Sequence, residues 1–232
     1  MALLFGSKFT RANAGAGSTT TVGSYTLHTF TSSTNFTPTS SGMIDILAIG
    51  SGGSASPGGQ PFSNAGGGGA GATVYKKFQP VIAGTPYTIT VGTNGSATSF
   101  GSLVTAPGGG PGGYENGNGT PAPGASGGGG GSNTSAGTGA GVYGIGFPGA
   151  GPGAGGGGGA GGAGTLSPGQ GGPGVPIAYF VGFSTIVSVG GPAGSVPAVL
   201  GITSSSYGSG ATVRETFAFT LGRPGIVYIR YI

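Results

Sequence analysis

The sequence predicts an all-β protein with a β-sandwich or jelly-roll-like core and long glycine-rich loops. Short segments of alternating apolar and polar residues recur along the chain, separated by turns rich in glycine and proline. No segment shows the 3.6-residue periodicity of an amphipathic helix. Residues 106–174 contain 33 glycines in 69 positions, which disfavours ordinary helices because glycine loses the most backbone entropy on ordering.

Roughly eight strands are expected, as in two-layered antiparallel folds. Met43–Ile49 is apolar apart from Asp45, which is typical of a strand covered on both faces. We predict that Ile226–Tyr231 pairs with this strand at the centre of a sheet. The other expected strands are Tyr25–Phe30, residues 35–37, residues 73–78 ended by Pro80, and residues 87–91, 100–105, 177–189 and 213–221.

Two states are open to the glycine-rich stretch. It is either a flexible linker or a set of extended coils of the polyproline II type, with three residues per turn. Coils without Cβ atoms can approach until their backbones hydrogen-bond laterally, as in polyglycine II. A collagen helix is excluded, because runs such as Gly127–Gly131 break the requirement for glycine at every third position.

The chain divides into an arm, residues 1–24, and a glycine-rich β domain, residues 25–232, with glycine-rich insertions at about 50–72 and 106–174. The arm carries a small apolar patch of Leu3, Leu4, Phe5 and Phe9, and it runs into Ala14-Gly15-Ala16-Gly17 and a threonine cluster, where a hinge is expected. This patch is a candidate for docking on a partner protein, and the alternative is a frayed terminus.

The composition argues against an enzyme. The chain has one histidine, three carboxylates and no cysteine, so little material exists for acid–base catalysis or a metal site, and we expect no cofactor. His28 is expected to be a half-exposed strand residue, and Asp45 a paired structural acid. The net charge of +4 is scattered, which argues against nucleic-acid binding. Neither a membrane-spanning segment nor a signal peptide is expected.

Isolated aromatic residues in the glycine-rich stretch are the candidate binding residues. Tyr114, Tyr143 and Phe147 stand among glycines, and aromatic faces stack on sugars or fill pockets of a partner. Binding residues also concentrate on loops that a rigid scaffold supports. The alternative is that these three side chains only cap the packed coils.

Several short sequence segments, taken in their order along the chain, resemble the glycine-rich domain of tailed-bacteriophage tail and fibre proteins. They are residues 27–33, the strand 44–49 leading into glycine, 87–92, 100–102 and the closing segment 225–231. The composition is also similar to that of distal adhesins of long tail fibres, in which polyglycine II coils form a sandwich. Unlike a typical long fibre, this chain lacks an extended shaft and coiled-coil heptads.

The resemblance implies a virion structural protein, made in the host cytoplasm and placed in the tail or fibre. Its expected partners are other virion proteins and a bacterial surface glycan or outer-membrane protein. A homo-oligomer is expected, with a trimer favoured, because a chain with so little core gains burial by association. The alternatives are a capsid decoration or head-fibre protein and a cellular wall or matrix protein.

Overall fold

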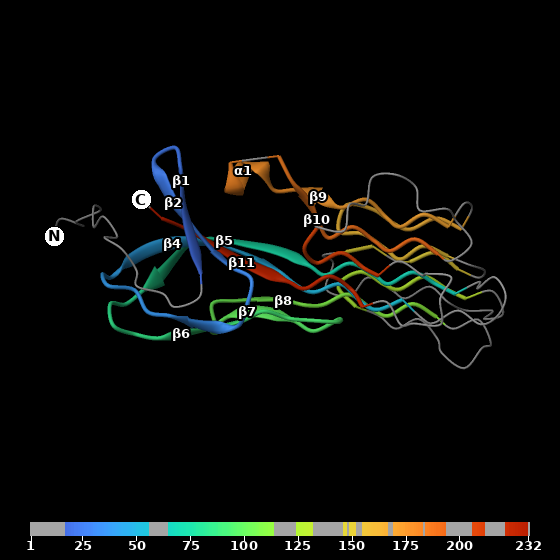
Figure 1. The fold of residues 1–232 in the computed structure, drawn as a ribbon, viewed down its shortest axis with the longest axis horizontal. Helices are drawn as coiled ribbons and strands as arrows, with labels where there is room; N and C mark the ends of the chain where they lie inside the picture. Colours follow the sequence, from blue (N-terminus) through green and yellow to red (C-terminus); the bar gives the residue numbers. More distant parts are fainter. Residues whose placement is uncertain are drawn as a thin grey trace.

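A computed structural model gives the fold of this chain. It describes residues 17–55, 65–113, 124–131, 146–147, 149–151, 155–166, 169–182, 184–193, 206–211 and 221–231. A β-sandwich forms one end of the elongated molecule, and glycine-rich segments run side by side along the long axis at the other end (Figure 1). We call these packed segments the glycine layer: residues 50–55, 65–72, 107–113, 124–131, 146–147, 149–151, 155–166, 169–174, 188–193, 206–211 and 221–225.

Two antiparallel sheets form the sandwich, so the all-β prediction is confirmed. The larger sheet has the order β1 (Ser18–Val22), β2 (Tyr25–Phe30), β11 (Ile226–Tyr231), β4 (Gly42–Ile49), β5 (Thr73–Val81). The smaller sheet has the order β3 (Thr34–Phe36), β6 (Tyr87–Thr90), β7 (Thr98–Phe100), β8 (Val104–Ala106). Phe30, Phe36, Ile46, Phe100 and Ile229 are fully buried in the core between them.

The predicted pairing of the closing strand is confirmed. Strand β11 lies between β2 and β4 at the centre of the larger sheet, with Ile226 opposite Ile49 and Arg230 opposite Asp45. Its outer face is also covered, by β9 (Val175–Pro176), α1 (Ala178–Val181) and β10 (Ile186–Val187). Both strands therefore bury side chains on both faces, which explains their nearly continuous apolar sequence.

Four expected boundaries are corrected by the structure. Strand β5 continues through Pro80 to Val81, because β5 is an edge strand, where a missing N–H is tolerated. The single strand expected at 100–105 is a hairpin of β7 and β8, turned at Gly101, which has φ +50°. Residues 177–189 include helix α1, whose left-handed C-cap is Gly182. The threonine cluster in the predicted arm forms β1 rather than a hinge.

The segment expected as a strand at 213–221 lies outside the described residues, except for Leu221. Leu221 is exposed and is not part of a strand.

The glycine layer continues the register of the larger sheet. Ile49 of β4 stands opposite Thr73 of β5, and the next lateral bonds run from Gly50 to Ala72 and from Gly53 to Gly69. Within residues 50–55 only every third residue bonds to the segment 65–72, whereas in a strand every second residue bonds to a given neighbour. The chain therefore passes from a two-fold strand to a three-fold coil without losing its alignment.

The central coil of the layer, residues 65–72, is bonded on all sides. Its successive N–H groups donate in rotation to residues 107–113, 155–166 and 206–211, over N···O distances of 2.8–3.1 Å. Its carbonyls accept from residues 50–55, 124–131 and 188–193. A three-residue rotation with neighbours on every side is the packing expected of polyglycine II coils. The described glycine segments are therefore packed coils and not flexible linkers.

Gly68→Ala is predicted to destabilise the protein strongly. A Cβ built at Gly68 overlaps the carbonyl oxygen of Gly53, so the methyl group separates two hydrogen-bonded backbones. Overpacking of this kind costs about 1–3 kcal/mol or more. Chemical unfolding of both proteins measures the change in the free energy of unfolding.

The matched control is Gly162→Ala, on an outer segment of the layer. A Cβ there meets only ring atoms of Pro173, at 2.9 and 3.0 Å. Both substitutions restrict the unfolded chain equally, so their difference isolates the backbone overlap. Equal stabilities of the two variants would contradict the packed-coil account.

Candidate functional site

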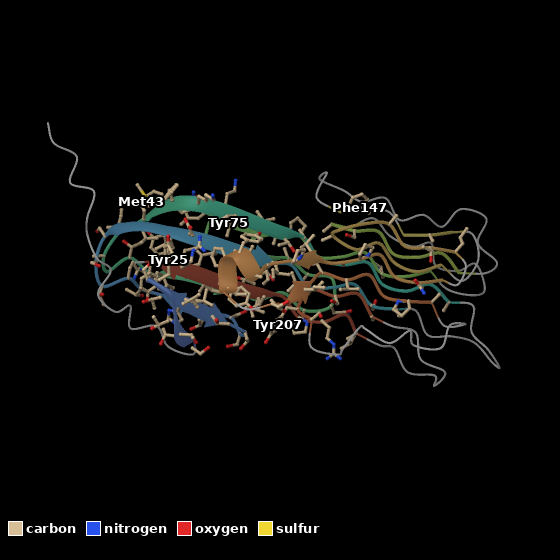
Figure 2. All side chains as sticks on the ribbon, turned by 90° about the horizontal axis from the view of Figure 1, so that it is seen from above. Tyr25, Met43, Tyr75, Phe147 and Tyr207 are labelled. Atoms are coloured by element: carbon tan, nitrogen blue, oxygen red, sulfur yellow. The ribbon has the colours of Figure 1, made fainter. Side chains whose placement is uncertain are left out.

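Phe147 is the one sequence-predicted binding residue that the structure describes. Its side chain is 43% exposed and projects from the glycine layer (Figure 2). Its carbonyl accepts a hydrogen bond from the N–H of Gly127, at 3.1 Å, so the backbone that carries the ring belongs to the coil packing. Tyr114 and Tyr143 lie outside the described residues, as do Leu3, Leu4, Phe5 and Phe9 of the arm.

The coil geometry explains why Phe147 is exposed among buried neighbours. A Cβ at Gly146 would overlap the carbonyl of Ala125, and a Cβ at Gly149 would overlap the carbonyl of Gly128. These two positions, three residues apart, face the packed interior. Phe147 is one residue out of that register and faces away.

Leu166 occupies a comparable place that the sequence analysis missed. Gly161 and Gly164, again three residues apart, face the carbonyls of Gly174 and Gly156, and Leu166 is 48% exposed. The adjoining turn is tied by bonds between Thr165 and Gln170, which involve both backbones and the Thr165 hydroxyl. A signal was present in the sequence, because Gly161 and Gly164 follow the three-residue spacing and Leu166 lies outside it.

The layer surface is almost without charge. Among its described segments, Arg223 is the only residue with a charged side chain. Apart from Arg223, the described surface offers no group for ion pairing, so isolated apolar side chains and exposed backbone dipoles are its main means of contact. Burial of about 100 Å² of apolar side-chain surface by a partner would contribute about 2.5 kcal/mol.

A second cluster, also missed, surrounds Arg230 on the outer face of the larger sheet. The guanidinium forms a salt bridge with Asp45 at 2.9 Å and donates to the Tyr179 carbonyl at 3.1 Å. It lies over the rings of Tyr25, at 4.7 Å, and Phe180, at 4.6 Å. These contacts fasten α1 to the sheet. The prediction that Asp45 is a paired structural acid is confirmed.

Asp45 also holds a bulge in the edge strand. Its Oδ1 accepts from the N–H of Phe78, whose φ is +52°, where the β4–β5 register shifts between Ile44 and Ile46. Burial acts to raise the pKa of Asp45, but the bonds from Arg230, Phe78 and Tyr75 outweigh it and lower the pKa. Burial and the bond to Asp45 raise the pKa of Tyr75 to about 12.

His28 is buried, so the expectation of a half-exposed residue was wrong. It is 1% exposed and stacks on Phe30 at 4.3 Å, because the smaller sheet covers this face of β2. Within the described residues, neither ring nitrogen has a hydrogen-bond partner. Burial lowers the pKa of His28, while the nearby backbone of Gly17 acts to raise it. A neutral ring packed on Phe30 serves the core.

No group of three or more histidine, cysteine, aspartate or glutamate residues in the described part of the chain could hold a metal ion. Among the same residues, no helix is long and apolar enough to cross a membrane.

The salt bridge of Asp45 predicts an acid-sensitive stability. Because the folded-state pKa of Asp45 lies below the unfolded value of about 3.9, its contribution is present above that pH. The contribution is lost as the pH falls through the folded pKa. We expect Asp45→Asn to lower the free energy of unfolding at pH 7 by about 1–3 kcal/mol and to flatten its decline in acid. Denaturant unfolding between pH 2 and 7 tests this.

The control for this prediction is Lys76→Gln, at an exposed position of the same edge strand. It should leave the acid decline unchanged. An Asp45→Asn variant with the wild-type pH profile would show that the pair with Arg230 does not stabilise the fold.

Comparison with known proteins agrees with this architecture. No curated protein matches the chain significantly. A family model described as a glycine-rich domain matches residues 26–232, which include β2 except for Tyr25, strands β3 to β11 and every described segment of the glycine layer. The chain therefore belongs to this family of glycine-rich domains.

Proposed function

We propose that this chain is a bacteriophage virion structural protein, a tail-fibre or tail-tip component that binds the host cell surface through its glycine layer. The observation that carries the proposal is the layer itself. A set of coils held by backbone hydrogen bonds presents Phe147 and Leu166 to solvent on a surface nearly without charge. The resemblance of the sequence to phage tail and fibre proteins supports the same function.

The layer suits recognition because the backbone that carries its outward side chains is held by hydrogen bonds and close packing. Phe147 lies between Gly146 and Gly149, which are packed against a neighbouring coil. A ring on such a backbone loses little conformational freedom on binding, so more of its burial energy appears as affinity. The chemical class that fits is a neutral surface with apolar patches, such as the C–H faces of a glycan or the exposed loops of an outer-membrane protein.

A second part of the proposal concerns attachment. In this proposal Leu3, Leu4, Phe5 and Phe9 dock the arm on another virion protein, leaving the glycine layer directed away. Deletion of residues 1–16 should then abolish incorporation into particles, measured by immunoblotting of purified virions. Normal incorporation of the truncated protein would remove this part of the proposal and leave host binding untouched.

Host binding is tested by adsorption of the fluorescently labelled protein to candidate bacteria, in competition with infection. We expect saturable binding that blocks infection. Phe147→Ala should weaken binding by about fivefold or more if the ring is a central contact, as truncation of such residues costs above 1 kcal/mol. Tyr114→Ala and Tyr143→Ala are measured in parallel.

The matched control is Phe78→Ala, which removes another exposed phenyl ring. Phe78 is 72% exposed but lies on the sandwich, on edge strand β5. It should bind like the wild type. Absence of binding by folded wild-type protein would contradict the host-attachment role and favour a decoration or head-fibre role. Labelling of the protein in imaged particles would then show its position.

A further inference from the structure

The two edges of the larger sheet differ in how they meet solvent. Edge strand β5 carries the common devices that prevent another strand from adding. Lys76 and Lys77 are exposed, Pro80 lacks an N–H, and the bulge at Phe78 breaks the regular row of backbone groups. This edge is closed to strand addition.

The opposite edge, β1, has none of these devices. Its sequence, Ser18–Val22, contains no charge, no proline and no glycine, and three of its five residues are threonine. The register with β2 is regular from Ser18 opposite Thr29 to Val22 opposite Tyr25. Its first four residues are exposed, and in the described part of the chain β1 pairs with β2 alone.

The hairpin geometry shows which backbone groups face outward. The loop between β1 and β2 is the two-residue turn Gly23–Ser24, with φ +60° at Gly23. Such a turn is closed by a hydrogen-bonded pair, here Val22 and Tyr25. Because bonded and non-bonded pairs alternate along an antiparallel ladder, the N–H and C=O groups of Thr19 and Thr21 lie on the open side.

We propose that β1 is a self-association edge, which pairs antiparallel with β1 of a second copy about a twofold axis at Thr20. Thr19 of each copy then lies opposite Thr21 of the other, and these residues exchange the outward backbone bonds. The two Thr20 side chains face each other in a non-hydrogen-bonded pair. The result joins two five-stranded sheets into one continuous sheet across the axis.

Charge favours a second copy as the occupant. A twofold axis places only the residue on the axis directly opposite itself, but it brings two copies of the same strand side by side, so a charged strand would place like charges close together. Strand β1 is neutral and can pair with itself, whereas β5, with Lys76 and Lys77, cannot. Cross-strand threonine pairs are favourable at the positions created.

The turn itself is not covered by another described segment. A Cβ added at Gly23 meets nothing within 4 Å. A joint of one short strand is smaller than a standard interface, and we expect a dissociation constant in the micromolar range or weaker. This inference is independent of host binding. It specifies a twofold contact between two copies, whereas the composition of the chain favours a trimer.

The experiment uses the lack of cysteine in the chain. Thr20→Cys introduces a single thiol at the proposed axis, where directly opposed Cβ atoms lie about 4.5–5.5 Å apart. Under mild oxidation we expect a crosslinked dimer to form at least tenfold faster than with Lys77→Cys, at the closed edge. Thr19→Cys and Thr21→Cys should each crosslink slowly alone and faster when mixed. Equal rates for Thr20→Cys and Lys77→Cys would overturn the proposal.

A second measurement does not depend on crosslinking. The molar mass of the wild type, measured by light scattering over a range of concentrations, should rise towards that of a dimer. Thr20→Lys places two lysines opposite each other and should weaken dimerisation at least tenfold, while Thr20→Val should retain it. Far-UV circular dichroism confirms that both variants are folded. A stable trimer, or a dimer insensitive to Thr20→Lys, would contradict the β1 joint.

Discussion

The structure depends on backbone-to-backbone contact that only glycine allows. A three-fold coil directs successive N–H groups to different sides, so a buried coil needs a hydrogen-bonding neighbour in each direction. Residues 65–72 have such neighbours, and at Gly66, Gly67, Gly68, Gly69 and Gly71 an added Cβ would overlap a carbonyl oxygen. The layer is therefore stabilised by satisfied peptide groups in a dense interior, where an ordinary domain would use large apolar side chains.

The sandwich supplies what the layer cannot supply for itself, which is register. Repeated glycines carry no side-chain pattern, so one coil can slide past another without changing its contacts. The pairs Ile49–Thr73 and Ile226–Ile49 fix the alignment of β4, β5 and β11, and Ile49 and Ile226 are buried in one apolar cluster. The coils that adjoin these strands inherit that alignment, as the bonds from Gly53 to Gly69 and from Gly52 to Arg223 show. The core of the sandwich therefore determines the packing of the layer.

Sequence reasoning succeeded where a pattern was long and self-contained. The apolar run at Met43–Ile49 and the closing strand identified the centre of the larger sheet, and glycine content predicted packed coils as one of two alternatives. It failed where tertiary contact overrides the local pattern. His28 shares a face with Phe30, yet its burial depends on Phe36, which the smaller sheet brings over it. Helix α1 is four residues long, too short for a helical periodicity to be seen.

The Arg230 cluster was beyond sequence reasoning for a different reason. Arg230 and Asp45 are separated by 185 residues, and they meet because β11 and β4 are neighbours in the sheet. The predicted strand pairing brought the two residues to one region, but it could not show that Tyr25 and Phe180 enclose the guanidinium. Phe147 was predicted to be a surface residue because an aromatic residue among glycines has no local core to join, whereas Leu166 is an ordinary residue that only the three-residue register distinguishes.

That register separates packing positions from outward-facing positions within a single coil. At Gly146 and Gly149 every side chain is excluded by a neighbouring carbonyl, so these positions serve the packing alone. At Phe147 the side chain faces outward, and a substitution there leaves the backbone bonds of the coil in place. The layer can therefore present different outward residues on an unchanged scaffold. Such independence is what a surface that meets variable partners requires, and a core built from interlocking side chains does not provide it.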